Sequence, residues 1–594
     1  MQRKHPLIKL MQENENEEAK RHKLSSHNTD LPGKGNDNNQ PSTSRAVVPT
    51  NLENISDDVI THSPTPFPKK IGFPEKKKLD EKLLELVTKD YQPFSIVEDE
   101  GFRNFTNALN SSYILPSRKT LSNTLLAAKF EEVKMKTSEI MKRVKSVTIT
   151  TDCWTSVNND GFIAVTAHFI DDNFLAKSIL LEVAECNTRH TSINLANELR
   201  KTTSEWGIEH KILLCLSDNA ANIKKAVCDE LHWTHLGCVA HTINLIVQGS
   251  LTLDLVKPIL TKISDMVSHF KRSSLAKSKL DFYQKQNGKT PKKLIQAVST
   301  RWNSVYYMLE RIKELKEEVR TSLAAIGKED WPMLTHQEYK YVEEITQILA
   351  PLESTTVFMS AEKQVTLSSV IIITNGLKEL YKELEKKCQF SLLGKSILQS
   401  ILSGIENRFK NMEINDTLLL STFLDPRFKH VGFSTESATE KAKTLATNAL
   451  TALINKKTDE LLPPLTSTAD PEVQASREQV PNEEQFSIWR SFDKKALGFV
   501  PVQSKQSRAQ LEIQRYLEEP LLSRSVNPLE WWKINTYNYP YLSELVTVKF
   551  GTVATSVPCE RMFSKSGQII SDRRNRISSN KVKQIMFVNQ NDFC

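Results

Sequence analysis

The chain has 594 residues and a mass of 67.6 kDa, which corresponds to roughly four domains at about 150 residues each. Apolar residues make up 39% of the chain and charged residues 25%, a composition that excludes a wholly disordered protein and a collagen-like one. The formal net charge of +8 permits an anionic partner without requiring one.

The N-terminal part of the chain divides into a tail and a helical segment. Residues 1–68 are rich in Asn, Ser, Thr, Pro, Lys and Glu, and their sparse apolar residues show no period, so we expect a disordered tail. The basic clusters Lys69-Lys70 and Lys76–Lys78 fit either a nuclear import signal or a solvated basic linker. Helical periodicity then predicts a small helical domain at 69–144.

Residues 145–250 show the pattern of a mixed sheet. Three segments with strand character precede a helix, a fourth strand and a second helix; in order they are 146–151, 161–170, 175–183, 191–206, 211–216 and 220–231. The fourth strand is almost wholly apolar, as expected for a strand that is buried on both faces. This order of elements is typical of the first half of a ribonuclease H-like fold.

The rest of the chain is predicted to be mainly helical. Residues 251–505 show almost only helical periodicity, which predicts an all-α region. Within it, residues 456–484 are rich in Pro, Ser, Thr and Glu and are expected to form a loose linker or a long loop. Residues 506–594 are again compact and rich in aromatic side chains.

Two aspartates follow predicted strands. Asp152 comes just past the first strand and Asp218 just past the fourth. If these strands are neighbours, both carboxylates emerge at one sheet edge, where α/β sheets bind ligands. Carboxylate oxygens suit Mg²⁺, and paired metal ions can promote phosphodiester cleavage. Aspartate after a strand is also ordinary turn and helix-cap chemistry, so Asp218 equally fits an N-cap.

A series of short motifs occurs between residues 79 and 594. They are Thr151–Ser156, Asp218–Asn222, Cys238–His241, Asn244–Ile246, Ser299–Ser304, Phe423–Lys429, Pro528–Trp532, Tyr539–Leu542, Ala554–Ser564 and Asp572–Arg576. In this order they resemble the motifs of hAT-superfamily DNA transposases. The resemblance is greatest to the branch of zinc finger BED domain-containing proteins, many of which are domesticated host proteins.

The resemblance implies a fold and a site. The fold class is α/β plus all-α: a ribonuclease H-like mixed sheet domain interrupted by a large all-α insertion. The site is an Asp-Asp-Glu triad of Asp152, Asp218 and Glu560 that binds Mg²⁺ or Mn²⁺ when the protein is catalytic. His241 matches a histidine beside the scissile phosphate, where an imidazole can stabilise charge on a phosphate oxygen. The implied reaction is nicking of an element end, hairpin formation on flanking DNA and strand transfer.

The resemblance also implies residues that contact DNA. Trp302 matches a tryptophan that stacks on an extruded base, and Arg301 would contact a phosphate beside it. An ordinary core tryptophan is an equal alternative. Arg573, Arg574 and Arg576 fit either contacts to the DNA backbone or pairs on a helix surface.

The C-terminal segment matches the family's dimerisation region, which predicts a homodimer or a higher oligomer. It contains an aromatic cluster formed by Trp531, Trp532, Tyr537, Tyr539 and Tyr541. Aromatic side chains suit an interface core, and they suit the core of a monomer equally well.

Zinc is not expected. His232, His235, Cys238 and His241 have a spacing that resembles a zinc site, but their steps of three residues do not share one face of a helix. The family's BED finger uses paired cysteines and histidines, whereas the first cysteine here is Cys153. We therefore expect the N-terminal finger to be absent.

Two functions remain open. One is a Mg²⁺-dependent transposase, favoured by the acidic triad; the other is a domesticated, non-catalytic DNA-binding or transcriptional regulator, favoured by the expected loss of the finger. No apolar run is long enough to cross a bilayer, so no membrane partner is expected. Eight scattered cysteines predict reduced thiols. Together with the resemblance, these features predict a nuclear location.

Overall fold

The computed structural model describes residues 71–155, 161–186, 189–298, 300–327, 333–361, 364–461, 505–570 and 577–592. The tail expected at 1–68 and most of the linker expected at 456–484 lie outside these ranges. The chain divides into two compact units, residues 1–131 and 132–594. Within the described ranges no helix has both the length and the apolar character that a membrane span requires.

The first unit is helical in its described part. It contains α2 (Phe73–Thr88), η1 (Phe94–Glu98), α3 (Glu100–Leu109), α4 (Arg118–Thr120), η2 (Leu121–Leu125) and the start of α5 (Leu126–Arg143). Apolar residues of α2 at helical spacing, Leu83, Leu84 and Val87, form its buried face. The Tyr113 hydroxyl donates to Asp80 at 2.7 Å, which attaches the loop after α3 to α2.

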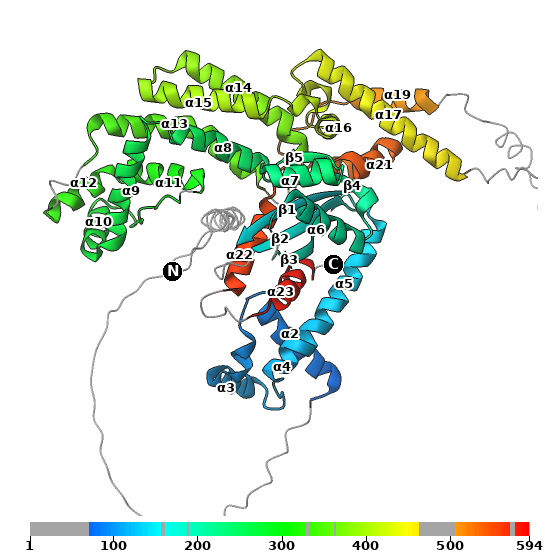
Figure 1. Cartoon of the computed structure of the whole chain (residues 1–594), viewed down its shortest axis with the longest axis horizontal. Coiled ribbons are helices and arrows are strands. Elements are labelled where there is room, and N and C mark those ends of the chain that lie inside the picture. The colour runs from blue at the N-terminus through cyan, green and yellow to red at the C-terminus, as the bar shows by residue number, and fades with distance from the viewer. Residues whose placement is uncertain are drawn as a thin grey trace, which may run out of the picture. The chain divides into compact units, whose positions relative to one another are not determined.

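The second unit begins with a five-stranded mixed sheet in the order β3-β2-β1-β4-β5 (Figure 1). The strands are β1 (Val147–Thr155), β2 (Gly161–Ile170), β3 (Ala176–Glu185), β4 (Ile212–Ser217) and β5 (His235–Gly237). β1 pairs antiparallel with β2 and parallel with β4, so it is the central strand. The first four strands confirm the prediction. β5 was not predicted, because three residues are too few to show alternation.

One correction concerns Asp152, which lies within β1 and not past its end. Its register partner on β2 is Ala164, whereas the pairing of β1 with β4 extends only from Val147 to Thr150. The hairpin partner β2 is therefore longer than the parallel neighbour, and β1 continues beyond the edge of β4. Asp218 directly follows β4, as predicted.

Alternation along β1 separates the two faces of the sheet. Val147 and Ile149 belong to an apolar cluster that includes Leu195 and Leu199 of α6 (Ser192–Glu205). This face is also covered by α7 (Ala221–Lys225) and by the short π-helix η4 (Ala226–Glu230). These two elements stand where a single helix was expected at 220–231. The other face carries buried threonines of β1, and it receives a helix from the C-terminal part of the chain.

Every element that the structure describes after β5 is a helix. The first group is α8 (Val239–Leu251), α9 (Lys257–Arg272), α10 (Ser274–Gln286), α11 (Trp302–Glu314), α12 (Lys316–Ala325) and α13 (His336–Met359). The second group is α14 (Val370–Lys387), α15 (Leu392–Arg408), α16 (Asp416–Phe423), α17 (Glu436–Leu461) and α19 (Lys505–Glu518). Short 3₁₀ helices are also present: η5 (Leu367–Ser369), η6 (Met412–Ile414) and η7 (Lys429–Gly432) in this region, and η3 (Glu209–Lys211) before β4. Because α17 continues to Leu461, the expected linker begins later than residue 456.

The C-terminal helices return to the sheet. They are α20 (Pro528–Ile534), α21 (Pro540–Lys549), α22 (Val557–Ile569) and α23 (Ser579–Asn591). α22 packs on β1 and β2, and α23 packs on β3. The Asn591 amide donates to the Leu180 carbonyl at 2.8 Å and accepts from the Leu180 N–H at 3.0 Å, so α23 satisfies backbone groups of the edge strand β3.

Candidate active site

Three carboxylates from distant parts of the sequence meet at one end of the central strands. Asp152 lies on β1, Asp218 follows β4, and Glu560 lies in the first turn of α22. Asp152 is subject to the electrostatic repulsion of both Glu560 and Asp218. The structure therefore brings the three predicted triad residues into one neighbourhood, although it is the return of α22 to the sheet that places Glu560 there.

The electrostatics of Asp152 are unusual for an aspartate. Burial, and then the negative charge of Glu560, raise the pKa of Asp152 to about 8; Asp218 adds a smaller effect in the same direction. The Cys153 N–H donates to the Asp152 carboxyl at 2.9 Å and opposes this shift without cancelling it. Without a bound cation, Asp152 is consequently protonated at neutral pH.

Cationic side chains converge on Glu560. Burial raises the pKa of Glu560, and the charges of Arg301, His241 and Arg561 lower it, with Arg301 the strongest of the three. Burial in turn lowers the pKa of Arg301, which Glu560 opposes. The predicted residues His241 of α8 and Arg301 before α11 thus join the carboxylates in this part of the fold.

α22 is attached to the sheet by the residue next to Glu560. Cys559 is fully buried, and its thiol contacts the Thr150 hydroxyl at 3.2 Å and the Thr150 carbonyl at 3.4 Å. Beneath it, Nε2 of His168 is 2.8 Å from the Thr166 hydroxyl, and burial lowers the pKa of His168 to about 3. This polar layer was not among the predicted site residues. Two threonines and a histidine on the inward face of otherwise apolar strands were its only signal in the sequence.

Backbone contacts position the segments that carry the other site residues. The Cys238 N–H donates to the Ser217 carbonyl at 2.7 Å, and the Ser556 N–H donates to the Cys238 thiol at 3.3 Å. Ser217 precedes Asp218, Cys238 begins the segment that carries His241, and Ser556 is the N-cap of the helix that carries Glu560. The end of β4 and the starts of α8 and α22 are therefore held together.

The alternative role of Asp218 as a helix cap is not what the structure shows. The N-cap of α7 is Ala220, and no side chain caps that helix. Asp218 instead accepts a hydrogen bond from the Ala220 N–H at 3.2 Å, which is a local turn contact. At this distance the hydrogen bond to that carboxylate oxygen of Asp218 is weak.

Within the ranges that the structure describes, no group of three or more His, Cys, Asp or Glu side chains is arranged to hold a metal ion. This holds for Asp152, Asp218 and Glu560: their charges interact, but their side chains are not arranged around one metal position. It also holds for His232, His235, Cys238 and His241: the His235 ring contacts the Ser217 hydroxyl at 2.9 Å, and Cys238 is buried as the N-cap of α8.

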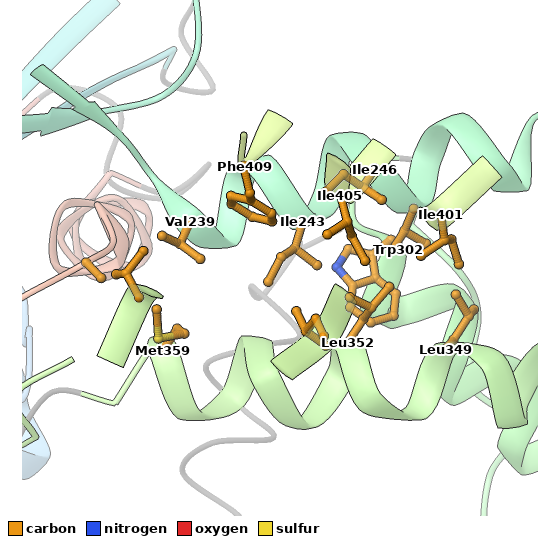
Figure 2. Close-up of a cluster of buried hydrophobic side chains, with 14 of the residues drawn as sticks. Val239, Ile243, Ile246, Trp302, Leu349, Leu352, Met359, Ile401, Ile405 and Phe409 are labelled. Carbon is orange, nitrogen blue, oxygen red and sulfur yellow. The ribbon is translucent and has the colours of Figure 1, made fainter. Parts of the chain in front are cut away.

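Trp302 lies in the helical core. Its ring is 1% exposed and packs among Ile246, Leu352 and Ile405 from three other helices (Figure 2). The indole N–H has no hydrogen-bond partner in the structure. In this conformation Trp302 presents no face for a base, as the core alternative predicted. Arg573, Arg574 and Arg576 lie outside the described residues.

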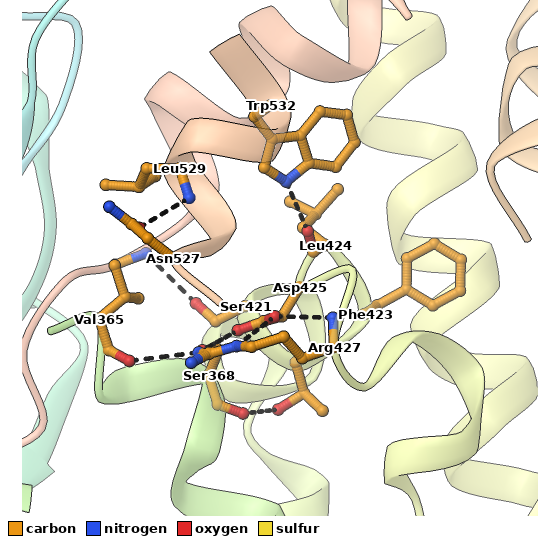
Figure 3. Close-up of polar contacts among 12 residues, drawn as sticks. Val365, Ser368, Ser421, Phe423, Leu424, Asp425, Arg427, Asn527, Leu529 and Trp532 are labelled. Atoms are coloured by element: carbon orange, nitrogen blue, oxygen red, sulfur yellow. Dashed lines mark hydrogen bonds and ion pairs between the residues drawn. The ribbon is translucent and has the colours of Figure 1, made fainter. Parts of the chain in front are cut away.

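The C-terminal aromatic cluster divides into buried and exposed members. The Trp532 ring is fully buried, and its N–H donates to the Leu424 carbonyl at 2.9 Å (Figure 3). Tyr539 is 4% exposed and Trp531 stacks on it at 5.7 Å. Tyr537, in contrast, is 95% exposed, and Ile534 at the end of α20 is 79% exposed.

Comparisons with known proteins match the segments of the chain that carry the site residues. The ZBED1 RNase-like domain matches residues 150–239, the ZBED1 RNase-like helical domain matches residues 236–348, and the hAT family C-terminal dimerisation region matches residues 512–591. The first of these segments contains Asp152 and Asp218, and the last contains Glu560.

Curated relatives are similar over most of the chain. Human "Zinc finger BED domain-containing protein 4" is 23% identical over 88% of this chain and 44% of its own length. "Putative AC transposase" of Zea mays is 23% identical over 87% of this chain and 66% of its own length. "Putative transcriptional regulator tpeD" of Talaromyces stipitatus is 25% identical over 85% and 61%. The chain thus spans about half to two thirds of the relatives it matches.

Proposed function

From the relationship of this chain to the hAT transposases and the zinc finger BED domain-containing proteins, we propose that it is a nuclear, dimeric DNA-binding protein with a carboxylate site for phosphodiester chemistry. The observation that supports the site is electrostatic. Asp152 carries a pKa raised by both Glu560 and Asp218, and Arg301 and His241 act on Glu560 in the same place. Perturbed carboxylates that gather from separate elements are typical of functional sites.

Asp152, Asp218 and Glu560 would hold Mg²⁺ or Mn²⁺ in this proposal. The donor chemistry fits, because hard oxygen ligands suit these ions. The carboxylates also repel one another when they are ionised, and a divalent cation would offset that repulsion. The bound ion would supply Lewis-acid activation of water and of a phosphate oxygen. Because the carboxylates are not gathered into a closed set of ligands, ion binding requires a rearrangement of their side chains.

The protein's own cations would bind and orient the DNA backbone. Arg301 and His241 come from the starts of two different helices and both act on Glu560. A phosphate at this position would receive charge-assisted hydrogen bonds from a guanidinium and an imidazole. Glu560 would keep both side chains in place before the phosphate arrives.

We further propose that residues 145–250 and 506–594 form one ribonuclease H-like domain, interrupted by the helices of 251–505. The packing of α22 on β1 and β2 supports this arrangement. Dimerisation is proposed to use Ile534 and Tyr537, because they are exposed apolar side chains within the matched dimerisation region. The buried aromatic residues of that region would then serve the monomer core.

Strand cleavage by the purified protein tests the catalytic proposal. A duplex that carries the inverted repeats flanking the gene would be incubated with Mg²⁺ or Mn²⁺, and hairpin and nicked products would be separated on a denaturing gel. We expect product from the parent chain and none from Glu560→Gln. Glu530→Gln is the matched control, because Glu530 is an exposed glutamate on α20.

The second candidate is a non-catalytic regulator that retains DNA binding and dimerisation. It is favoured by the absence of a closed metal-ligand set in the described residues and by the name of the fungal relative. Absence of product from a folded, dimeric parent chain that still binds DNA would reject the catalytic proposal in favour of this one. Absence of product together with loss of DNA binding would reject both.

A further inference from the structure

The positive charge of this protein is concentrated in one short segment. Residues 257–293 contain ten basic residues and two acidic ones, so their net charge of +8 equals the formal net charge of the whole chain. The basic residues are Lys257, Lys262, Lys271, Arg272, Lys277, Lys279, Lys285, Lys289, Lys292 and Lys293, and the acidic ones are Asp265 and Asp281. The positive and negative charges of the remaining residues are equal in number.

The segment forms a helical hairpin whose apolar side is already covered. α9 buries Ile259, Ile263 and Met266, and α10 buries Ala276 and Leu280. α10 packs against both α9 and α12, next to α11 (Figure 1). Eight of the ten basic residues are exposed, and the other two, Lys262 and Lys279, are half-buried. The hairpin therefore presents its charge to solvent and its apolar residues to the core.

Most of this charge is not neutralised within the protein. Lys262 pairs with Glu338, Lys289 with Glu318 and Lys292 with Glu314. No other ion pair involving the hairpin is present among the described residues; the cations without one are Lys257, Lys271, Arg272, Lys277, Lys279, Lys285 and Lys293.

Helix capping does not account for the pattern. Lys271 and Arg272 lie in the last turn of α9, where cations stabilise the helix dipole. Lys277, however, lies one turn into α10, near the end at which a cation is unfavourable. Because the cluster extends across the turn between two helices, with charges on both sides of Ser273, stabilisation of helix ends explains only part of it.

We propose that this cationic hairpin, residues 257–293, binds the phosphate backbone of duplex DNA. Duplex DNA carries one negative charge per about 1.7 Å of its axis, and binding strength comes from release of the counterions that its phosphates hold. α10 has 13 residues and is about 20 Å long, which matches roughly six base-pair steps of about 3.4 Å. This surface is separate from the carboxylate site, and the inference rests on the DNA binding proposed above, for which it names the residues.

An anionic membrane fits these residues less well. A helix that binds a membrane surface needs a free apolar face beside its basic residues. The apolar face of α10 is occupied by α9 and α12, and the exposed apolar side chains left on it are Leu275 and Phe282. These two are seven residues apart, which is about two helical turns, and Ser278 and Lys279 lie between them on that side of the helix.

Salt-dependent DNA binding tests the proposal. The full-length triple variant Lys271→Gln, Arg272→Gln, Lys277→Gln would be compared with the charge-matched control Lys386→Gln, Lys395→Gln, Lys410→Gln, which removes three exposed cations elsewhere. Fluorescence anisotropy with a short labelled duplex would be recorded between about 50 and 200 mM salt. Circular dichroism would confirm that both variants fold.

We expect the hairpin variant to bind at least about tenfold more weakly than the control. We also expect its plot of log Kd against log salt to be shallower by about 2 to 3, since each lost phosphate contact removes about 0.9 from the slope. Equal affinity and equal slope for the two variants would overturn the proposal, and so would a parent chain that does not bind duplex DNA.

Two further measurements distinguish DNA binding by the hairpin from catalysis at the carboxylate site and from lipid binding. Cleavage and DNA binding by the parent chain are separate readouts, so a parent that binds DNA without cleaving it leaves the hairpin proposal standing, whereas a hairpin variant that binds DNA as tightly as the control does not. Cosedimentation with phosphatidylserine vesicles is the membrane arm. Loss of vesicle binding without loss of DNA binding in the hairpin variant would replace the proposal with a lipid one.

Discussion

Two buried charged clusters in the second unit are built in opposite ways. Asp425 and Arg427 are 0% and 7% exposed; Nε of Arg427 donates to one Asp425 oxygen at 2.9 Å, and a terminal nitrogen donates to the other at 2.7 Å (Figure 3). The Ser368 hydroxyl donates to the same carboxylate at 2.6 Å. In the candidate active site, by contrast, Asp152 and Glu560 repel each other.

The difference separates charge that holds the fold from charge that, in the function proposed above, would bind a ligand. A buried pair joined by two parallel hydrogen bonds, with a third from Ser368, is a fixed structural link, here between η5, α16 and the chain that follows α16. Buried carboxylates that repel one another lower the stability of the fold, and a cation or a phosphate-bound cation is what they can bind. The Phe423–Lys429 motif therefore has a structural role in this fold.

The largest expected effect comes from breaking the paired cluster. Arg427→Met should lower the free energy of unfolding by about 3–5 kcal/mol, because it leaves the Asp425 charge buried without a partner. Urea unfolding followed by circular dichroism measures the change. The double variant Asp425→Leu, Arg427→Met should recover part of the loss; a double variant less stable than Arg427→Met would contradict the assignment of the loss to an unpaired charge.

The C-terminal aromatic residues give the next largest contrast. Trp532→Ala should lower stability by about 3–5 kcal/mol, because it removes a fully buried ring and the hydrogen bond to Leu424. Tyr537→Ser should change stability by no more than about 0.5 kcal/mol, since the side chain is 95% exposed.

The same pair tests the proposed dimer surface. Light scattering across a concentration series should show Tyr537→Ser shifted toward monomer while it remains folded. An unchanged dimer in both Tyr537→Ser and Ile534→Ser would place the interface elsewhere in the matched dimerisation region.

The pH dependence of stability tests the carboxylate cluster of the candidate active site. The pKa of Asp152 is about 8 in the fold and about 3.9 in an unfolded chain. Between these values the folded state holds a proton that the unfolded state has released, so the free energy of unfolding falls as pH rises from about 4 to about 8. Asp152→Asn should remove this contribution and flatten the profile.

Urea unfolding at a series of pH values in metal-free buffer measures that profile. Asp265→Asn is the matched control, because Asp265 is an exposed carboxylate on α9. A profile for Asp152→Asn that is as steep as those of the parent and the control would show that Asp152 is not protonated in the fold. If the carboxylates bind Mg²⁺, added Mg²⁺ should reduce the slope in the parent and in the Asp265→Asn control, but not in Asp152→Asn.

Glu560→Gln should have only a small effect on stability. Neutralising this side chain removes its repulsion of Asp152 and also its attraction to Arg301, so the two changes oppose each other. We expect a net change within about 1 kcal/mol, together with complete loss of cleavage if the protein is catalytic. A loss of several kcal/mol would mean that Glu560 is a structural partner of Arg301 and belongs with Asp425.

Four strands and the position of Asp218 could be predicted because they depend on local pattern. Alternation in residues 161–170 and the apolar character of 211–216 are properties of a few neighbouring side chains, and the structure confirms both strands. Asp218 after β4 follows from the same pattern. The position of Asp152 within β1 could not be predicted, because it depends on how far the partner strand β2 extends beyond β4.

The sequence by itself determined the first four strands and the helix between the third and the fourth, the helical nature of the long middle region and the concentration of basic residues at 257–293. Each is set by local periodicity or composition. Only the tertiary structure decided that Glu560 meets Asp152, that Trp302 is a core residue and that Asp425 is neutralised by Arg427. These are contacts or burial states that depend on how distant helices pack, and a buried charge acquires its role from the neighbours that packing brings to it.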